Sequence, residues 1–352
     1  MSGKSDPGRF FEDFRLGETI RHATPRSLGP GERALYIALT GSRFALQSSH
    51  EFARGLGLPG APLDDLLVFH IVFGRSVPDI SLNAVANLGY AEVRFSTPVY
   101  DGDSLTAQST VIGLKENSSR ETGTVYVRTT GVNQRGETVL ELVRWVMLRK
   151  RDKGAAAPPP AVPKLAEHVL LDSSLLPGLD LSRYDPDLGG GGHGWDDYEP
   201  GECIDHIDGM TIEESCHMTA TRLYQNTARV HLNQHAEKEG RFGRRIVYGG
   251  HVMSVARALS FNGLANAFRI AAINGGRHVN PCFAGDTVYA WTEVKAKLEP
   301  PGQRRDLGAL RLRTIATKNR PCADFPAEGP EILLDLDYTV ILPRRVQRHR
   351  NI

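Results

Sequence analysis

The sequence predicts an α+β protein made of two tandem copies of one fold, each a long antiparallel sheet wrapped around a buried helix. The first observation is a repeat in register. The segment Asp13–Glu18 returns as Asp197–Glu202, and His22 returns as His206 at the same offset of 184 residues. Because a register held over so long a span rarely arises by chance, we infer a duplication. A duplicated fold allows one copy to retain catalytic residues while the other copy loses them.

The second observation is that each half contains one segment with the pattern of a fully buried helix. Leu63–Val77 is apolar nearly all round, and Gly250–Phe268 has the same character. A helix that is hydrophobic on every face lies in the interior of a protein. We therefore expect one central helix in each copy.

The third observation is a set of strands after each helix. Segments rich in β-branched and aromatic residues begin directly after Gly102-Asp103 and Gly285-Asp286, and two long hairpins follow them. The expected strands are Ser104–Leu114, Thr124–Val132 and Thr138–Leu148 in the first copy, and Thr287–Leu298, Leu310–Thr317 and Ile332–Leu342 in the second. A long antiparallel sheet around one buried helix is the hot-dog architecture, so the chain is predicted to be a double hot-dog.

These patterns divide the chain into three parts. Residues 1–150 form the first hot-dog domain, 151–195 a linker rich in proline and glycine, and 196–345 the second hot-dog domain. The glycine run Gly189–Gly192 lacks the Lys-Ser/Thr ending of a phosphate-binding loop, which favours a connection.

Composition excludes several classes of function. The 352 residues carry a formal net charge of +1, so no overall field attracts nucleic acid or a membrane. The four cysteines lack zinc-ligand spacing, and we expect no metal site. With no apolar run of membrane-spanning length and no secretory signal, we expect a reduced, cytoplasmic protein. The arginine-rich tail is interpreted as a solvated end; its members are Arg344, Arg345, Arg348 and Arg350.

The two copies differ at the positions where catalytic residues are expected. The second contains His231 and, further on, the pair Gly249-Gly250. At the matching places the first has Gln47 and, instead of the glycines, Asp65-Leu66. We expect the second domain to hold the active site and the first to be non-catalytic.

The segment Tyr224–Met253 resembles the hydratase motif of MaoC-like, R-specific enoyl-CoA hydratases. In that motif a Gly-Asp-x-Asn-Pro-x-His run precedes a Phe-Gly pair and an Ile-x-His-Gly-Met turn. Here Gln225-Asn226 occupy the Gly-Asp positions, His231 occupies the histidine position, and Phe242-Gly243 match directly. Tyr248 stands for the histidine of the final turn.

The whole chain outside the linker is similar to the mesaconyl-CoA hydratases, also called β-methylmalyl-CoA dehydratases. Segments of that family are matched by Asp64–His70 and Asn262–Phe268. The resemblance implies a hydro-lyase of acyl-CoA metabolism and carbon assimilation, which reversibly hydrates mesaconyl-CoA (2-methylfumaryl-CoA) to β-methylmalyl-CoA (3-methylmalyl-CoA). It implies an acyl-CoA thioester as partner, no cofactor because CoA is part of the substrate, and a possible homo-oligomer.

Site roles follow from the chemistry of hydration. His231 suits proton transfer because its pKa lies near neutrality, while Gly249 and Gly250 open a helix whose free N–H groups can stabilise an enolate oxygen. The family's catalytic acid is replaced by Asn226, which cannot act as a base, so Asn226 either orients the water or caps a turn. Tyr248 either contacts the substrate or only packs.

The substrate's free carboxylate calls for an arginine, because guanidinium groups bind carboxylates bidentately. Four arginines flank the motif: Arg222, Arg229, Arg244 and Arg245. We assign Arg229 and Arg245 to substrate binding, although the four also fit a binding site for a CoA phosphate or a surface with no role. The turn residues Asp101, Asp103 and Asp286 are interpreted as structural.

Three alternatives remain at this point. The chain could hydrate another enoyl-CoA. It could be an acyl-CoA thioesterase, for which Asp64 or Asp65 would supply the carboxylate, although an N-cap role on the buried helix fits both residues better. It could also be a non-catalytic acyl-CoA-binding protein.

Overall fold

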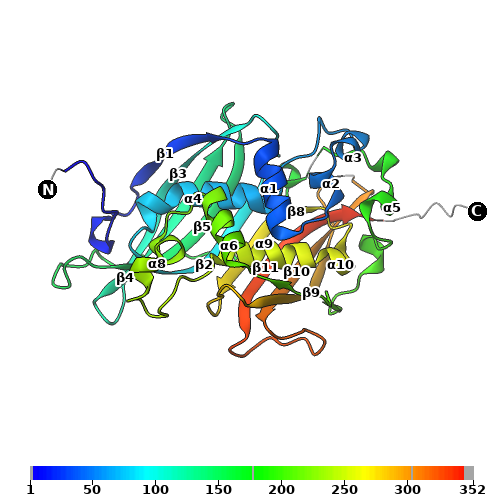
Figure 1. The fold of residues 1–352 in the computed structure, drawn as a ribbon. Helices are drawn as coiled ribbons and strands as arrows, with labels where there is room; N and C mark the ends of the chain where they lie inside the picture. The colour runs from blue at the N-terminus through cyan, green and yellow to red at the C-terminus, as the bar shows by residue number, and fades with distance from the viewer. Residues whose placement is uncertain (1–2, 177, 303, 345–352) are drawn as a thin grey trace, which may run out of the picture.

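The computed structural model describes residues 3–176, 178–302 and 304–344, and it contains two hot-dog units in tandem (Figure 1). Three of the four arginines of the tail, Arg345, Arg348 and Arg350, lie outside the described residues. The elements of the first unit are η1 (Phe11–Asp13), β1 (Thr19–Ser27), α1 (Pro30–Thr40), α2 (Ala45–Ser48), α3 (His50–Gly55), α4 (Asp65–Ile80), β2 (Ala84–Phe95), β3 (Ser104–Glu116), β4 (Thr122–Val132) and β5 (Thr138–Arg149).

The second unit repeats this order with one extra strand at its start and one extra short helix after its central helix. Its elements are η4 (Trp195–Asp197), β6 (Cys203–Asp205), β7 (Met210–Thr211), α6 (Glu214–Leu223), α7 (Arg229–Leu232), α8 (Gln234–Glu237), α9 (Gly249–Leu259), α10 (Phe261–Leu264), β8 (Arg269–His278), β9 (Thr287–Leu298), β10 (Leu307–Lys318) and β11 (Ile332–Pro343). The segment between the units contains η2 (Ser173–Leu175), η3 (Leu181–Arg183) and α5 (Pro186–Gly189).

One antiparallel sheet runs through both units. Its strand order is β1-β3-β4-β5-β2-β8-β11-β10-β9-β6, and β7 pairs with β9 outside this path. The units are joined where β2 pairs with β8, with Tyr90 opposite Gly276 and Val93 opposite Ile273. This seam brings residues that are almost two hundred positions apart into contact, and it lies beside the candidate site.

Both central helices lie on the same face of the sheet (Figure 1). Helix α4 contacts β1, β3, β4 and β5, and α9 contacts β9, β10 and β11. All but three of the sixteen residues of α4 are buried, which confirms the prediction from its apolar pattern. The expected helix Gly250–Phe268 is shorter than predicted. It ends at Leu259 because Asn262 and Gly263 leave helical geometry, Gly263 with φ +104°.

The internal repeat is visible in buried hydrogen bonds. In the first unit His22 Nε2 lies 2.7 Å from Ser109 Oγ, and in the second His206 Nε2 lies 2.8 Å from Thr292 Oγ1. The Gly-Asp turns also match. The carboxylate of Asp103 accepts from the Tyr100 N–H, and that of Asp286 accepts from Phe283, both at 2.9 Å. These aspartates are structural, as predicted.

The segment between the units packs against the second unit. The Val169 N–H donates to Asn274 Oδ1 at 2.9 Å, and Asn266 Nδ2 donates to the Gly191 carbonyl at 2.8 Å. In the part of the chain that the structure describes, the helices are all too short or too polar to cross a membrane.

Candidate active site

The motif loop between α6 and α7 is held by close contact with the helix of the other unit. Gln225 has φ +51°, a left-handed conformation that glycine adopts most easily, and it occupies the glycine position of the hydratase motif. Beneath it, a Cβ added to Gly74 of α4 would lie 1.9 Å from the Tyr224 carbonyl oxygen. Gly74 therefore lets the loop backbone lie directly on α4.

His231 is held in one tautomer. Its Nδ1 lies 3.0 Å from the carbonyl oxygen of Ile246, and a carbonyl can only accept, so Nδ1 carries the proton and Nε2 keeps its lone pair. The side chain is buried, and burial lowers the pKa of His231 to about 4. The ring is therefore neutral at pH 7, with Nε2 available as a proton acceptor.

Helix α9 begins with the glycine pair, directly after Tyr248. In the described structure, the N–H groups of Gly249 and Gly250 have no hydrogen-bond acceptor, and no side chain caps the helix. The free N–H groups and the helix dipole both favour negative charge at this end. The start of α9 can therefore stabilise an oxyanion.

Neighbouring rings leave no room for side chains at the glycine pair. A Cβ on Gly249 would lie 2.5 Å from Nδ1 of His278, and one on Gly250 would lie 2.5 Å from the Tyr248 ring. The ring centroids of His231 and Tyr248 are 5.6 Å apart, so the structure brings His231, Tyr248 and the glycine pair together.

Two further histidines belong to this cluster, and sequence reasoning did not identify them. His70 of α4 has Nδ1 3.3 Å from the Tyr248 hydroxyl and Nε2 2.8 Å from Ser254 Oγ. His278, the last residue of β8, has Nε2 3.0 Å from the Tyr90 hydroxyl. Burial lowers the pKa of both imidazoles, that of His278 to about 4.

Asn226 has a structural contact of its own. Its side chain is 2 % exposed, and Oδ1 accepts from the Ala228 N–H at 3.1 Å. The carbonyl oxygen thus caps the turn before α7, which leaves the Nδ2 amide as the group that could donate to a ligand.

The flanking arginines differ in their contacts. Arg245 pairs with Glu214 and donates to the Leu232 carbonyl at 3.3 Å. The guanidinium of Arg244 lies over the Phe283 ring, 3.9 Å from its centroid. Arg229 is exposed, and its guanidinium makes no ion pair or hydrogen bond to another described residue.

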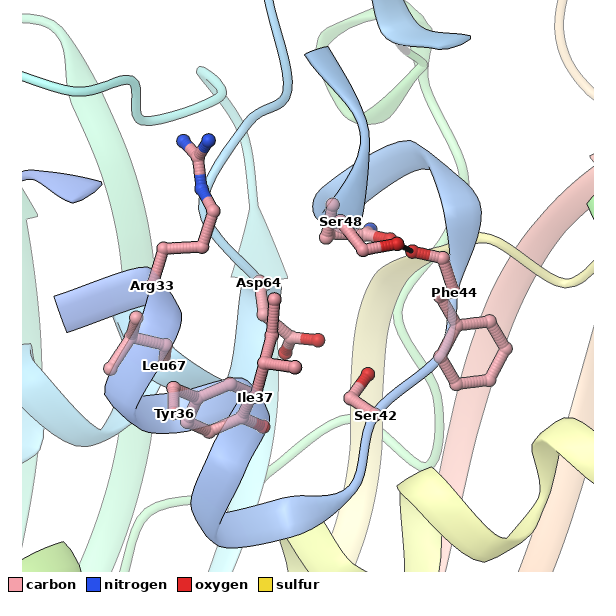
Figure 2. A pocket seen from close by; sticks show the side chains of 9 residues that line it. Arg33, Tyr36, Ile37, Ser42, Phe44, Ser48, Asp64 and Leu67 are labelled. Carbon is pink, nitrogen blue, oxygen red and sulfur yellow. Dashed lines mark hydrogen bonds between the residues drawn. The ribbon is translucent and has the colours of Figure 1, made fainter. Parts of the chain in front are cut away.

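The matching place in the first unit has different chemistry (Figure 2). The Asp64 carboxylate accepts from the Leu66 N–H at 2.9 Å, the predicted N-cap contact, and Asp65 accepts from the Ile270 N–H at 2.9 Å. Gln47 donates to the Phe268 carbonyl at 2.5 Å. The pocket between α1 and the Ser42–Phe44 segment has a cavity volume of about 10 Å³, which leaves room for one water molecule.

Among the described residues, no group of three or more His, Cys, Asp or Glu side chains is arranged to hold a metal ion.

Comparisons with known proteins agree on one family. The family described as mesaconyl-CoA hydratase matches residues 2–323. A β-methylmalyl-CoA dehydratase of Chloroflexus aurantiacus is 62% identical over 98% of this chain and 100% of its own length. A mesaconyl-CoA hydratase of Cereibacter sphaeroides is 58% identical over 97% of this chain and 100% of its own.

Solved structures show the same fold. A MaoC domain protein dehydratase of Chloroflexus aurantiacus aligns with TM-score 0.95 and 61% identity, covering 98% of this chain and 100% of the other. Rv0216 of Mycobacterium tuberculosis, a double hot-dog protein, aligns with TM-score 0.75 and 24% identity over 96% of this chain and 99% of its own. The predicted double hot-dog fold is thereby confirmed.

Proposed function

Because this chain belongs to the mesaconyl-CoA hydratase family, we propose that it reversibly hydrates mesaconyl-CoA to β-methylmalyl-CoA. The chain is a hydro-lyase whose substrate is a CoA thioester. The observation that carries the proposal is the pairing of a neutral His231, with Nε2 unprotonated, and the free N–H groups at the start of α9.

In this proposal the residues of the site carry out each part of the hydration. His231 Nε2 removes a proton from water as the water oxygen attacks the β-carbon. Charge then develops on the thioester oxygen, where the Gly249 and Gly250 N–H groups stabilise it; one such donor contributes ~3 kcal/mol. The His231 imidazolium then returns its proton to the α-carbon, so the elements of one water are added and His231 ends neutral.

Recognition of the substrate's second carboxylate falls to Arg229 in this proposal. Arg245 was also predicted for this role, but its guanidinium already pairs with Glu214. Arg229 has no such partner among the described residues, so a bound carboxylate would supply its first charge-assisted bond. Asn226 is proposed to orient the attacking water through Nδ2, since Oδ1 is occupied by the Ala228 N–H.

The thioesterase alternative has little support from the geometry. It needs a carboxylate facing a thioester carbonyl, and Asp64 and Asp65 instead accept hydrogen bonds from backbone N–H groups. The space beside Asp64 holds about one water molecule.

One assay separates the candidate functions. Purified protein is incubated with mesaconyl-CoA while the enoyl-thioester absorbance and free thiol are followed together. Hydration removes the absorbance without releasing thiol, hydrolysis releases thiol, and a binding protein does neither. Thiol release at the rate of absorbance loss would contradict the proposal.

The proposal also covers the localisation, the metabolic role and the oligomeric state of the enzyme. We place the enzyme in the cytoplasm, which agrees with four cysteines that form no disulfide. We assign it to carbon assimilation through acyl-CoA intermediates, and we expect a homo-oligomer. Cell fractionation and sedimentation velocity test the first and the last.

A further inference from the structure

A hydrogen bond across the seam between the units fixes the orientation of His278. Tyr90 lies on β2 of the first unit and His278 ends β8 of the second, and the two strands are neighbours in the sheet. The Tyr90 hydroxyl lies 3.0 Å from His278 Nε2. Tyr90 is 1% exposed, so this buried hydroxyl needs a partner within the protein.

The Tyr90 hydroxyl needs an acceptor for its proton, and this need selects one tautomer of His278. Nε2 is the only hydrogen-bond partner of the Tyr90 hydroxyl among the described residues. If Nε2 carried the imidazole proton, the hydroxyl proton would have no acceptor. If the hydroxyl donates to Nε2 instead, its proton is satisfied, and the imidazole proton is on Nδ1.

A buried cation behind Tyr90 strengthens this arrangement. Arg144 of β5 is wholly buried, and its guanidinium donates only to the hydroxyls of Ser76 at 2.8 Å and Ser81 at 3.2 Å. It has no carboxylate partner in the described structure. Burial raises the pKa of Tyr90 and keeps its proton in place, while the charge of Arg144 acts in the opposite direction and makes the hydroxyl a better donor.

The protonated face of His278 is directed at the oxyanion site. Its Nδ1 lies against Gly249, where an added Cβ would be 2.5 Å away. The side chain keeps part of its surface exposed, unlike Tyr90 behind it. A neutral imidazole at this position can donate Nδ1–H to an oxygen that the Gly249 N–H also binds.

We propose that neutral His278 is a catalytic residue, which donates its Nδ1–H to the thioester oxygen of the substrate beside the Gly249 and Gly250 N–H groups. Tyr90 and Arg144 are positioning residues, since they act through the His278 tautomer. The first unit would then serve the reaction in the second across the β2–β8 seam. This inference rests on the proposed hydratase function.

Kinetics of three variants test the donor role with mesaconyl-CoA. His278→Ala removes the donor and should lower kcat by about 100- to 1,000-fold, with a much smaller change in KM. Tyr90→Phe keeps the imidazole but removes the hydrogen bond that fixes its tautomer. It should lower kcat about tenfold, the cost of one ordinary hydrogen bond. Tyr338→Phe is the matched control, because it removes another buried hydroxyl, 3.0 Å from Thr314 Oγ1, and should keep the wild-type kcat.

A second readout needs no substrate. Long-range ¹H–¹⁵N spectra of the labelled protein distinguish Nδ1–H from Nε2–H imidazoles, and His278→Gln identifies the signals of His278. We expect Nδ1–H in the wild type and in Tyr338→Phe, and a mixture of tautomers in Tyr90→Phe. If Tyr90→Phe does not fold, the wild-type spectrum still decides the tautomer.

An Nε2–H tautomer in the wild type, or a kcat for His278→Ala within a few-fold of wild type, would overturn the inference. Failure of the proposed function looks different, because the wild type would then leave mesaconyl-CoA unhydrated whatever the tautomer of His278.

Discussion

The Tyr248 hydroxyl lies 3.3 Å from Nδ1 of His70, so a side chain on the central helix of the first unit holds the residue directly before the central helix of the second. His70 is in turn bonded to Ser254 of α9, which accepts from Tyr36 of α1 at 3.0 Å. The start of α9 is therefore positioned by both units. The first unit acts as a support for the site even though it lacks a histidine where the second has His231.

The close packing at the start of α9 predicts a loss of both activity and stability for Gly250→Ala. The new Cβ would lie 2.5 Å from the Tyr248 ring and 2.6 Å from His70 Cε1, so one of the two rings must move. Such overpacking destabilises a core by about 1–3 kcal/mol. Urea unfolding and kcat should both show the change, while Gly275→Ala, whose Cβ meets nothing within 4 Å, should change neither. Equal behaviour of the two variants would contradict this account of the packing.

Recognition of the second carboxylate predicts a specificity ratio. We expect mesaconyl-CoA to be preferred over crotonyl-CoA by at least ~100-fold in kcat/KM, because only mesaconyl-CoA has a carboxylate that can form a charge-assisted bond with Arg229. Arg229→Ala should collapse that ratio, mostly through loss of activity on mesaconyl-CoA. Arg222→Ala is the control, since its guanidinium donates to the Met218 carbonyl at 3.4 Å and faces solvent. If the ratio is unchanged in Arg229→Ala, another residue recognises the carboxylate.

The buried and half-buried histidines predict a loss of stability in mild acid. Burial lowers the pKa to about 4 for His206, His231, His251 and His278. In the unfolded chain each takes up a proton near pH 6.5, so between pH 6.5 and 4 the unfolded state binds more protons and stability falls as pH falls. Each histidine contributes a slope of up to about 1.4 kcal/mol per pH unit in that window.

Asp64 and Asp65 act with the opposite sign but are two groups against four. Burial raises the pKa of both carboxyl groups, that of Asp65 to about 6, so their contribution to stability grows as pH falls. The free energy of unfolding, measured in urea at pH 7.5, 6 and 5, should therefore drop by several kcal/mol. A free energy that stays constant over this range would show that the histidines are not held neutral.

The strands were predictable because their patterns are local. Thr287–Leu298 was predicted with the bounds that β9 has, and the hairpin of β4 and β5 differs from expectation by two residues at most. Five strands were missed: β1, β2, β6, β7 and β8. Ala256–Ile273 is apolar at most of its positions, and a segment of this kind is consistent with both a helix and a buried strand. The predicted helix was therefore extended to Phe268, up to the start of β8.

The residues of the site could be predicted from the sequence only where they belong to the motif segment. His231 and the glycine pair follow from their spacing within one segment. His70 and His278 are placed beside them by the packing of α4 against the motif loop and by the β2–β8 pairing, which join positions far apart in the chain. No local pattern distinguishes these histidines from the other members of the twelve in the sequence.

The central claim is that mesaconyl-CoA is hydrated at one site in the second unit, and parallel turnover measurements on His231→Ala and Gln47→Ala test it most directly. The account predicts that His231→Ala lowers kcat by about two to four powers of ten, the range for loss of general acid–base catalysis. Gln47→Ala, at the matching position of the first unit, should keep kcat near the wild-type value. A fall of similar size in both variants, or turnover by His231→Ala within a few-fold of wild type, would contradict the claim.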